Sequence, residues 1–297
     1  MIAVYGAPPE DLVEVPSGAV QTSPLVPGAG TLEGLKDQSL DAFVVAAPPA
    51  TLERRYVLAQ ALRALKPGGE LIALAPKDRG GRRLKAELES FGCEVEDEGR
   101  RHARICRTTR PMDPENLDMA IAEGALREVA PGVWTQPGVF SWDRLDPGTE
   151  RLLEHLDGLS GVGADLGCGL GVLSRRALRS PDIKAITLVD IDRRAVEAAR
   201  RNINDPRASF VHGDVRSVPL ESLNFVIMNP PVHAGGLEDR GLGQTFIRRA
   251  AAALRRGGRL FMVANIDLPY EALLDELFAR VTPLEKGGGF KLFEAVK

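Results

Sequence analysis

The sequence predicts an α/β protein of two tandem domains, the first degenerate and truncated and the second complete. Three observations support this prediction. The chain has 297 residues, about twice the size of a typical single domain. Its C-terminal half alternates short β-branched runs with segments of helical period, which is typical of βαβ units around a parallel sheet. Two short motifs of that half also recur, in the same order, in the N-terminal half.

The C-terminal half provides the elements of a mostly parallel sheet with helices on both faces. Each expected strand is a short apolar run bounded by polar or turn-forming residues, and the expected helices fill the gaps between these runs. Strands are expected at 163–166, 185–189, 209–211, 224–228, 259–264 and 290–296. Helices are expected at 148–156, 171–178, 193–202, 243–254 and 270–279.

The N-terminal half carries an altered copy of two segments of this pattern. One copied segment is an apolar run ending in Pro-Pro, and the other is a helix end followed by Gly-Gly and an entering strand. The paired segments are 42–49 with 224–231, and 65–71 with 254–260. The first copy has Ala47 where the second has Asn229, and its stretch from Pro-Pro to Gly-Gly is shorter. We therefore expect the first copy to be catalytically inactive.

The domain boundary is expected near residue 110. Residues 1–40 contain only Gly28-Ala29-Gly30 and no glycine loop led by an acidic residue, so a cofactor pocket is not expected there. Prolines at 111, 114, 131 and 137 indicate a linker with one short helix around 117–129. The expected domains are 1–110, degenerate and non-catalytic, and 111–297, the linker and the catalytic domain.

Composition is that of a soluble protein, with 44% hydrophobic and 27% charged residues. The net charge of -3 gives no overall basic character, although residues 77–110 carry ten Lys/Arg against seven Asp/Glu. The three cysteines have no metal-ligand or disulfide spacing, so we expect no metal and a reducing, cytoplasmic setting. No basic leader is followed by an apolar run, and no apolar stretch is long enough to span a membrane.

The most specific motif is a glycine loop that follows a predicted strand. Asp165 lies within that strand, and Gly167, Gly169 and Gly171 follow it at alternate positions before a helix. Glycine permits positive φ at a sharp turn, and its missing Cβ lets a ligand lie against the backbone near a helix N-terminus. Val172 breaks the spacing of the dinucleotide-binding fingerprint counted from Gly167, so a different small ligand is expected.

Two carboxylates follow this loop in an order that predicts a nucleoside. Asp190 lies 23 residues after Gly167, at the end of the next strand, where it can accept hydrogen bonds from ribose hydroxyls. Asp214 follows the third strand and can meet the amino group of an adenine. Asp192 is expected instead to cap the helix that begins at residue 193.

Asn229-Pro230-Pro231 comes directly after an apolar strand, at the sheet edge where ligands of open α/β sheets bind. Methyl transfer to an exocyclic amine requires the nitrogen lone pair to face the methyl group while acceptors hold the N–H bonds. The side-chain oxygen of Asn229 and the carbonyl of Pro230 are predicted acceptors, stiffened by the prolines. His233 is a candidate proton acceptor, and Gly235-Gly236 would let the following loop close.

These motifs together resemble the small-subunit rRNA guanine-N2 methyltransferases of the RsmC type. The resemblance includes Gly138-Val139-Phe140-Ser141, Leu145-Asp146 and Gly148-Thr149 ahead of the glycine loop. It implies two tandem Rossmann-like methyltransferase domains, the first degenerate and truncated, the second a seven-stranded mostly parallel sheet with helices on both faces. It also implies S-adenosylmethionine as cofactor, near Phe140, Ser141 and Thr149 at its methionine end.

The same resemblance implies ribosomal RNA, or the small ribosomal subunit, as the partner, with no membrane and no metal; a monomer is compatible with the sequence. The first domain would help to grip the RNA, although it is shorter than the family pattern leads one to expect. The chain has Val232 where the family usually has an aromatic residue, so Phe140 or Trp142 would have to supply base stacking, or the acceptor differs.

Alternatives to guanine of small-subunit rRNA remain open. Asn-Pro-Pro turns of this kind also serve methylation of large-subunit rRNA guanine, adenine N6 and protein glutamine. A non-catalytic RNA-binding or assembly protein that keeps the cofactor pocket is the alternative from another functional class; the intact Asn229 argues against it.

Overall fold

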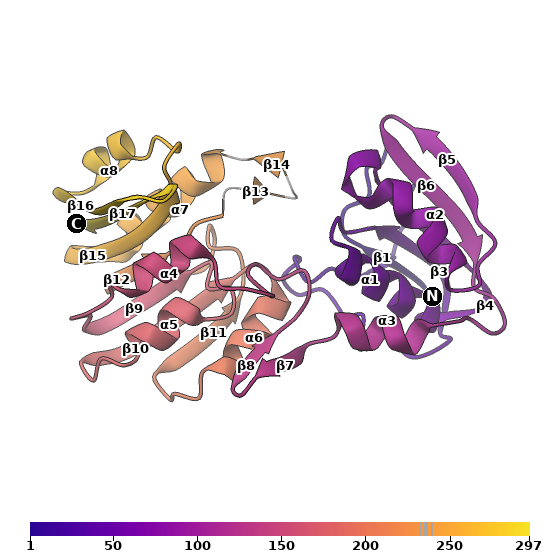
Figure 1. Ribbon diagram of the computed structural model, residues 1–297, viewed down its shortest axis with the longest axis horizontal. Coiled ribbons are helices and arrows are strands. Elements are labelled where there is room, and N and C mark those ends of the chain that lie inside the picture. Colours follow the sequence, from indigo (N-terminus) through magenta and orange to yellow (C-terminus); the bar gives the residue numbers. More distant parts are fainter. Residues whose placement is uncertain (232, 235–236, 239) are drawn as a thin grey trace. The chain divides into compact units, whose positions relative to one another are not determined.

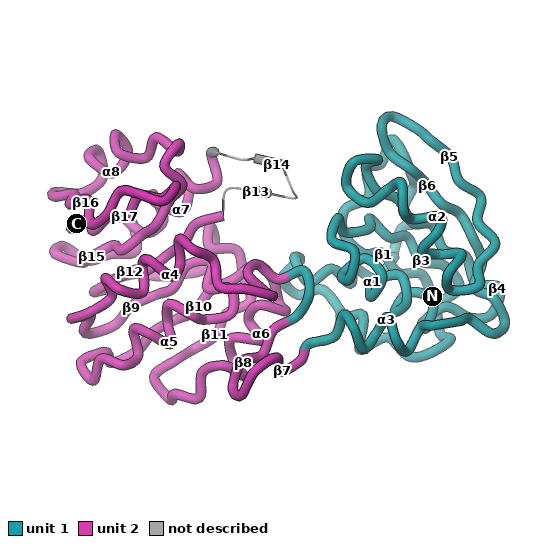
Figure 2. Tube along the Cα trace, in the orientation of Figure 1, with its two compact units in different colours: residues 1–126, 136–138 teal, residues 127–135, 139–297 magenta. Residues whose placement is uncertain are grey.

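The computed structural model describes the backbone of all residues except 232, 235, 236 and 239, and the side chains of all except 232–240. The chain forms two compact units, which are distinguished by colour in Figure 2. Unit 1 comprises residues 1–126 and 136–138, and unit 2 comprises residues 127–135 and 139–297. Each unit is built around its own main sheet (Figure 1).

Unit 2 has a seven-stranded sheet with the strand order β11-β10-β9-β12-β15-β17-β16 (Figure 1). The first five strands in this order run parallel, and β17 is antiparallel to both of its neighbours. The strands are β9 Gly161–Leu166, β10 Ile183–Asp190, β11 Ala208–His212, β12 Leu223–Met228, β15 Leu254–Asn265, β16 Arg280–Gly287 and β17 Phe290–Val296. The predicted seven-stranded, mostly parallel sheet is confirmed.

Helices cover both faces of this sheet, as predicted. Successive residues of a strand point to opposite faces: Val226 packs in one core with Ile247 of α7, and Phe225 packs in the other with Leu152 of α4. Helix α8 belongs to the first core, and α5 and α6 contribute to the second. The helices are α4 Pro147–Leu153, α5 Val172–Ala177, α6 Arg193–Asn202, α7 Arg240–Ala253 and α8 Glu271–Leu277.

Several elements of unit 2 were not predicted from the sequence. Edge strand β16 is largely exposed and contains Pro283, so it lacks the apolar alternation that identifies a strand. Residues 127–129, expected at the end of a short helix, and the linker residues after them instead form the antiparallel hairpin of β7 Arg127–Ala130 and β8 Val133–Thr135. Strands β13 His233–Ala234 and β14 Leu237–Glu238 form a second short antiparallel pair.

Unit 1 has a six-stranded sheet with the order β2-β1-β3-β4-β6-β5. This order matches β10-β9-β12-β15-β17-β16 of unit 2, and unit 1 has no counterpart of β11 in its sheet. The strands are β1 Ile2–Tyr5, β2 Val20–Gln21, β3 Leu40–Ala46, β4 Leu65–Pro76, β5 Glu96–Arg100 and β6 Ala103–Thr109. The shared order supports the duplication inferred from sequence.

The helices of unit 1 pack on a single face of its sheet. They are α1 Thr51–Ala64, α2 Arg82–Glu89, preceded by a π-helical turn η1 at Lys77–Gly81, and α3 Leu117–Gly124. Their core includes Phe43 and Leu71, whereas a small second core on the opposite face contains Val44 and Val13 from the irregular segment after β1. Unit 1 is therefore a truncated version of the fold of unit 2.

Strand pairing gives a residue-by-residue alignment of the two copies. Phe43 of β3 pairs with Leu71 of β4, and Val226 of β12 pairs with Leu260 of β15. Phe43 faces the core that contains α1, and Val226 faces the core that contains α7, the helix in the same position between strands. Phe43 and Val226 are therefore equivalent.

The sequence alignment of 42–49 with 224–231 is accordingly wrong by one residue. It paired Phe43 with Phe225, which faces the opposite side of its sheet, and a one-residue shift moves every side chain to the other face. Asn229 thus corresponds to Ala46 rather than Ala47. Because both are alanine, the first copy still lacks the amide at this position.

Unit 1 extends to Leu126 instead of ending near residue 110. Helix α3 packs against α1 so closely that a Cβ on Gly124 would lie 2.3 Å from Cβ of Tyr56. The buried side chain of Gln136 donates a hydrogen bond to the carbonyl of Gly124 at 3.0 Å. Side-chain packing therefore places in unit 1 part of the segment that proline content marks as a linker.

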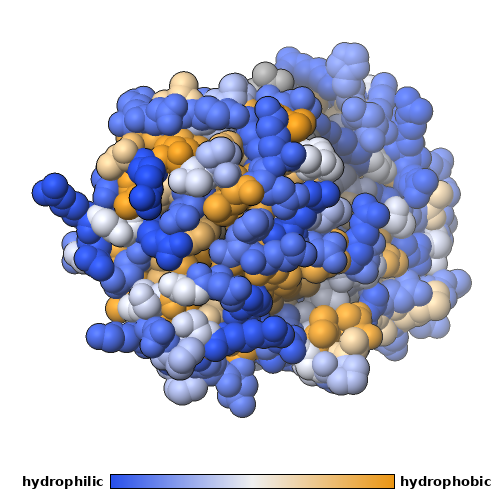
Figure 3. Space-filling model, turned by 60° about the vertical axis from the view of Figure 1, so that its left-hand side comes forward, coloured by the Kyte–Doolittle hydropathy of each residue, from blue (hydrophilic) through white to orange (hydrophobic). Residues whose placement is uncertain are grey.

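The surface drawn in Figure 3 is mainly hydrophilic, with hydrophobic side chains in separate patches. Within the described ranges, no helix is long and apolar enough to cross a membrane.

Candidate active site

The glycine loop connects β9 to α5, and all three of its alternate glycines have positive φ, between 52° and 79°. The backbone N–H groups of Gly167 and Cys168 both donate to the carbonyl of Val189, which fixes the start of the loop against β10. Apart from its two chain neighbours, no described residue has an atom within 4 Å of the position of a Cβ on Gly169, so its Cα faces open space. The loop therefore presents bare backbone at the sheet edge.

Gly167 and Gly171 are required for packing as well as for φ. A Cβ on Gly167 would lie 3.3 Å from the ring of Phe246 and 3.9 Å from Cδ of Pro231. A Cβ on Gly171 would lie 2.8 Å from Cδ1 of Ile203, so this glycine lets α5 approach α6. The loop is thus held close to the Asn-Pro-Pro turn.

Asp190 ends β10 and supports the same loop. Its Oδ2 accepts a hydrogen bond from the N–H of Gly169 at 2.8 Å, and its Oδ1 accepts one from the N–H of Asp192 at 2.9 Å. Asp190 is half-buried, and this burial raises its pKa to about 6. Asp192 caps α6 by accepting from the N–H of Arg194, as predicted.

Asp165 and Asp214 lie outside the cavity formed by the loop. Asp165 is fully buried; Ser174 donates to its Oδ2 at 2.6 Å, while its Oδ1 has no hydrogen-bond partner among the described residues. Burial raises the pKa of Asp165 to about 7. Asp214 follows β11 and binds Arg216, whose hydrogen bonds hold the pKa of Asp214 below its usual value.

Asn229 lies directly after β12, and its side-chain amide is held at one end. The Nδ2 of Asn229 donates to Oδ2 of Asp146 and to Oγ1 of Thr149, both at 2.9 Å. Asp146 also caps α4, because the same Oδ2 accepts from the backbone N–H of Thr149 at 2.7 Å. Sequence reasoning assigned Asp146 no role, since the bond to Asn229 joins residues far apart in the chain.

A cavity of about 200 Å³ within unit 2 brings the glycine loop and Asn229 together. Its walls come from the glycine loop, from Thr149 and Asn229, from residues 140–145, and from the β7–β8 hairpin. Of the predicted site residues, the cavity is lined by Phe140, Ser141, Thr149, Gly167, Gly169 and Asn229. The remaining predicted residues with described side chains, Asp165, Gly171, Asp190, Asp214, Pro230 and Pro231, lie outside its lining.

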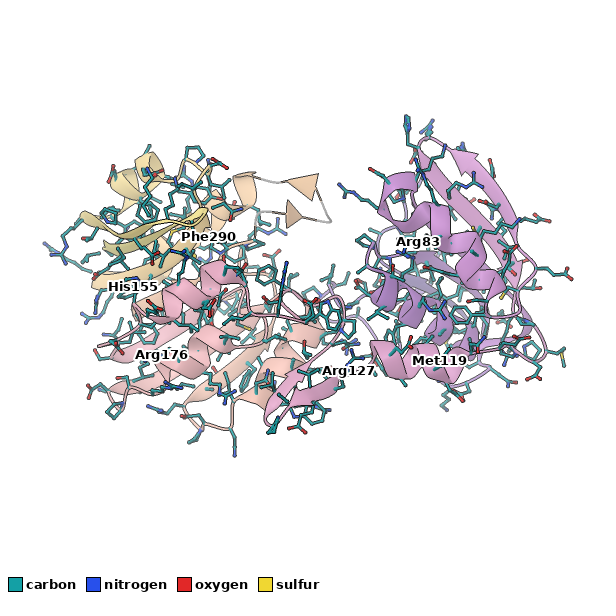
Figure 4. All side chains as sticks on the ribbon, in the orientation of Figure 1. Arg83, Met119, Arg127, His155, Arg176 and Phe290 are labelled. Atoms are coloured by element: carbon teal, nitrogen blue, oxygen red, sulfur yellow. The ribbon has the colours of Figure 1, made fainter. Side chains whose placement is uncertain are left out.

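The hairpin wall is attached to the glycine loop by Asn202 at the end of α6. Oδ1 of Asn202 accepts from the N–H of Trp134 at 2.6 Å, and its Nδ2 donates to the carbonyls of Trp134 and Leu170, each at 3.0 Å. The guanidinium of Arg201 stacks on the Trp134 ring, 4.4 Å from its centre. Arg127, labelled in Figure 4, similarly lies over the ring of Trp142. Sequence reasoning did not identify this wall.

The remaining predictions concern the loop after Pro231. Val232 and Gly235-Gly236 lie outside the described residues, and so does the side chain of His233, whose backbone begins β13. Pro230 is buried and Pro231 is exposed.

Comparison with known proteins places this site in a family. The model of the methyltransferase small domain matches residues 131–294, which include the glycine loop and Asn229. Ribosomal RNA small subunit methyltransferase C of Pseudomonas entomophila is 30% identical over 276 residues, covering 89% of this chain and 81% of the relative. The protein of the same name from Stutzerimonas stutzeri is 34% identical over 257 residues, covering 84% and 77%.

The chain belongs to the family of ribosomal RNA small subunit methyltransferase C. The predicted RsmC-type family is thus confirmed. The solved structure of the T. thermophilus 16S rRNA N2 methyltransferase RsmC, in complex with AdoMet and guanosine, matches with a TM-score of 0.80 and 24% identity. The match covers 100% of this chain and 88% of the RsmC chain, and it confirms the predicted fold across both units.

Proposed function

We propose that this RsmC-type protein transfers a methyl group from S-adenosylmethionine to the exocyclic N2 amine of a guanine in small-subunit ribosomal RNA. The curated relatives are named for this class of substrate, and the matching RsmC structure holds AdoMet and guanosine. The observation that carries the proposal for this chain is the oriented amide of Asn229. Its NH₂ is bound by Asp146 and Thr149, which leaves its oxygen as an acceptor at a cavity shared with the glycine loop.

The residues around the loop fit the cofactor. Gly169 offers bare backbone that faces open space. Each oxygen of Asp190 accepts one backbone N–H in the part of the chain described, and a carboxylate oxygen has a second lone pair for a ribose hydroxyl. Asp165 has a buried oxygen that no group in the described part of the chain binds, as expected where a bound group or an ordered water completes the site. Asp214 is the proposed partner of the adenine amino group, which would have to displace Arg216.

The protein's contribution to catalysis is mainly orientation. When bound, S-adenosylmethionine supplies an electrophilic methyl group on a sulfonium. Asn229 Oδ1 and the Pro230 carbonyl accept hydrogen bonds from the two N–H groups of the guanine amine. This arrangement points the nitrogen lone pair at the methyl group. The nitrogen would form a bond to the methyl carbon as the carbon–sulfur bond breaks and the sulfur leaves as a neutral thioether; the nitrogen would then lose one proton, for which His233 is the proposed acceptor.

Substrate stacking is assigned to Phe140. This aromatic lines the cavity and is 62% exposed, so its ring is available to a base at the mouth. Stacking of one base on an aromatic side chain contributes about 1 to 3 kcal/mol. Phe140 can therefore take the place of the aromatic that the family usually has after Pro231.

Unit 1 is proposed to be non-catalytic and to contribute to RNA binding. The pairing of β1 with β3 places Gly6 at the position of Gly167, but Pro8 and Pro9 follow it instead of further glycines. The pairing of β1 with β2 likewise places Ser23 at the position of Asp190. With Ala46 at the acceptor position, unit 1 lacks the glycine loop, the ribose carboxylate and the amide.

Methyl transfer to rRNA tests the proposal. Purified protein is incubated with tritiated S-adenosylmethionine and either small subunits or naked rRNA from cells that lack the gene, and the methylated nucleoside is identified by mass spectrometry. N2-methylguanosine in small-subunit rRNA is expected. Label in large-subunit rRNA, in adenine or in protein glutamine would show that this group, and not a small-subunit guanine, is the methyl acceptor. Cofactor binding without transfer to any of these would favour a binding or assembly protein.

A further inference from the structure

Asn229, Asp146 and Thr149 are joined to one another by hydrogen bonds. Nδ2 of Asn229 has two protons, and two acceptors lie at 2.9 Å from it, Asp146 Oδ2 and Thr149 Oγ1. The same Asp146 oxygen accepts the backbone N–H of Thr149 at 2.7 Å. Both donors of the amide are therefore used on one side, by residues at the start of α4.

Asp146 is the member of this set that fixes which end of the amide faces it. The oxygen and nitrogen of an asparagine side chain have nearly the same shape, so hydrogen-bond partners decide its orientation. The hydroxyl of Thr149 can donate or accept and therefore fits either orientation. An ionised carboxylate only accepts, so a flipped Asn229 would place its oxygen against Asp146 without a proton between them.

The position of Asp146 is itself held rigidly. Its backbone lies in the extended region, as an N-cap requires, and Pro147 follows at the first helical position with its preset φ. Gly148 leaves room for the carboxylate, because a Cβ there would lie 3.1 Å from Asp146 Oδ2 and 2.8 Å from the ring of Phe290. Phe290 lies at the start of β17 and is labelled in Figure 4. The carboxylate thus has little freedom to move away from Asn229.

We propose that Asp146 is a positioning residue that sets the orientation of the Asn229 amide and increases the hydrogen-bond basicity of its oxygen. This inference rests on the proposed function. A charged acceptor on the NH₂ group polarises the amide, because hydrogen bonds in a chain strengthen one another. The guanine amine becomes a stronger donor as it gains positive charge in the transition state. Asp146 therefore acts mainly on kcat.

A donor–acceptor exchange between the two positions tests this role. In Asp146→Asn, one end of an amide takes the place of Oδ2. An oxygen there still caps α4 and accepts from Asn229, but without the charge that polarises the Asn229 amide; an NH₂ there gives up the cap and binds a flipped Asn229. The variant therefore loses either the charge or the fixed orientation. We expect kcat to fall about 10- to 100-fold, the usual effect of losing a residue that orients a catalytic group. The KM for RNA and the Kd for S-adenosylmethionine should stay within about twofold.

Asn229→Asp alone places two carboxylates against each other and should lower kcat further. In the double variant Asp146→Asn/Asn229→Asp, the amide nitrogen at position 146 donates to the new carboxylate in place of accepting the Thr149 N–H, and the other carboxylate oxygen faces the substrate amine. We expect kcat of the double variant to exceed that of Asn229→Asp at least tenfold. A double variant no faster than Asn229→Asp, or an Asp146→Asn enzyme with kcat within twofold of the wild type, would overturn the proposal.

Two controls separate positioning from a structural role. Asp146→Ser can cap α4 but its side chain is too short to reach Asn229; with an unchanged melting temperature, its kcat should still fall. If capping were the whole role of Asp146, this variant would retain wild-type kcat. Asp157→Asn removes a carboxylate that is 79% exposed and does not line the cavity, and it should leave kcat unchanged.

A readout independent of activity distinguishes failure of this proposal from failure of the proposed function. In protein labelled with ¹⁵N-asparagine, the side-chain NH₂ of Asn229 should exchange slowly with solvent, and Asp146→Ser should accelerate that exchange at least tenfold. Unchanged exchange would exclude the bond to Asp146, whatever the acceptor of the methyl group. A wild-type protein that gives no methylguanosine but shows the protected NH₂ would refute the proposed function alone.

Discussion

Replacing Asp190 by alanine should weaken S-adenosylmethionine binding more strongly than the loss of one side-chain contact would suggest. The Asp190 carboxylate is proposed to bind both ribose hydroxyls, and it also accepts the backbone N–H groups of Gly169 and Asp192. Asp190→Ala removes the ribose contacts and also releases the glycine loop from the end of β10. The substitution therefore changes both the ligand contacts and the shape of the site.

The expected magnitude follows from the hydrogen bonds. A hydrogen bond to a charged group contributes about 1.5 to 3 kcal/mol, so two ribose contacts amount to about 3 to 6 kcal/mol. At 1.4 kcal/mol for each factor of ten, the Kd should rise about a hundredfold to ten-thousandfold. Asp190→Asn keeps an acceptor oxygen without the charge and should fall between alanine and wild type.

The pH dependence provides a second measure. Because burial raises the pKa of Asp190 to about 6, the carboxyl is ionised at pH 8 and mostly protonated at pH 5. If the ionised form binds the ribose, the affinity of the wild-type protein for S-adenosylmethionine should decrease about tenfold from pH 8 to pH 5. Asp190→Asn should show a correspondingly weaker dependence, which separates this group from others that titrate in the same range.

Isothermal titration calorimetry with S-adenosylmethionine measures each Kd, and circular dichroism confirms that each variant is folded. Asp205→Ala is the matched control, because Asp205 also accepts a backbone N–H, but from Arg207 and not from the glycine loop. A folded Asp190→Ala protein with a Kd within threefold of the wild type would refute the assignment of the ribose contact to this carboxylate.

Three further substitutions test other parts of the site. Asn229→Ala should lower methyl transfer to rRNA at least about a hundredfold in a tritium assay, as for loss of an oriented catalytic group, while calorimetry gives an unchanged cofactor Kd; parallel losses would contradict a role confined to the acceptor. Burial raises the pKa of Asp165 to about 7, so the folded protein holds this proton more tightly than the unfolded chain, and this group's contribution to stability is lost as pH rises from about 4 to 7. Asp165→Asn should therefore reduce the pH dependence of the melting temperature over this range. An unaltered pH dependence would argue that the buried carboxyl does not cause it. Gly171→Ala combines a φ of 79° with a Cβ 2.8 Å from Ile203 and should lose about 2 to 5 kcal/mol in urea unfolding, whereas Gly28→Ala, with a φ of 81° and open space, should lose only the backbone strain of about 1 to 2 kcal/mol; equal losses would show that the contact with α6 is unimportant.

Strand pairing explains why the duplication could be detected in the sequence but not aligned to the residue. The Pro-Pro and Gly-Gly turns are local features, and Gly68 and Gly257 have nearly the same positive φ, 75° and 76°. The alignment of β3 with β12 depends on which face of a buried sheet each side chain occupies. Both strands are apolar at almost every position, so alternation could not reveal the one-residue error.

The sequence by itself determined the features whose physical causes are local. Glycine spacing specifies the loop after β9, apolar runs specify the central strands, and Asp192 is recognisable as a helix cap because its partner is two residues away. The position of Asn229 at the sheet edge also follows, because the carboxyl ends of parallel strands meet on one side.

Only the tertiary structure decided how the site is oriented and enclosed. The bond between Asp146 and Asn229 joins residues 83 positions apart, and the one between Asn202 and Trp134 joins residues 68 positions apart. Such contacts depend on how α4 and the β7–β8 hairpin pack on the sheet, and no spacing along the chain encodes them. The residues able to bind a nucleoside can be read from the sequence, whereas the direction in which the Asn229 amide points depends on the folded chain.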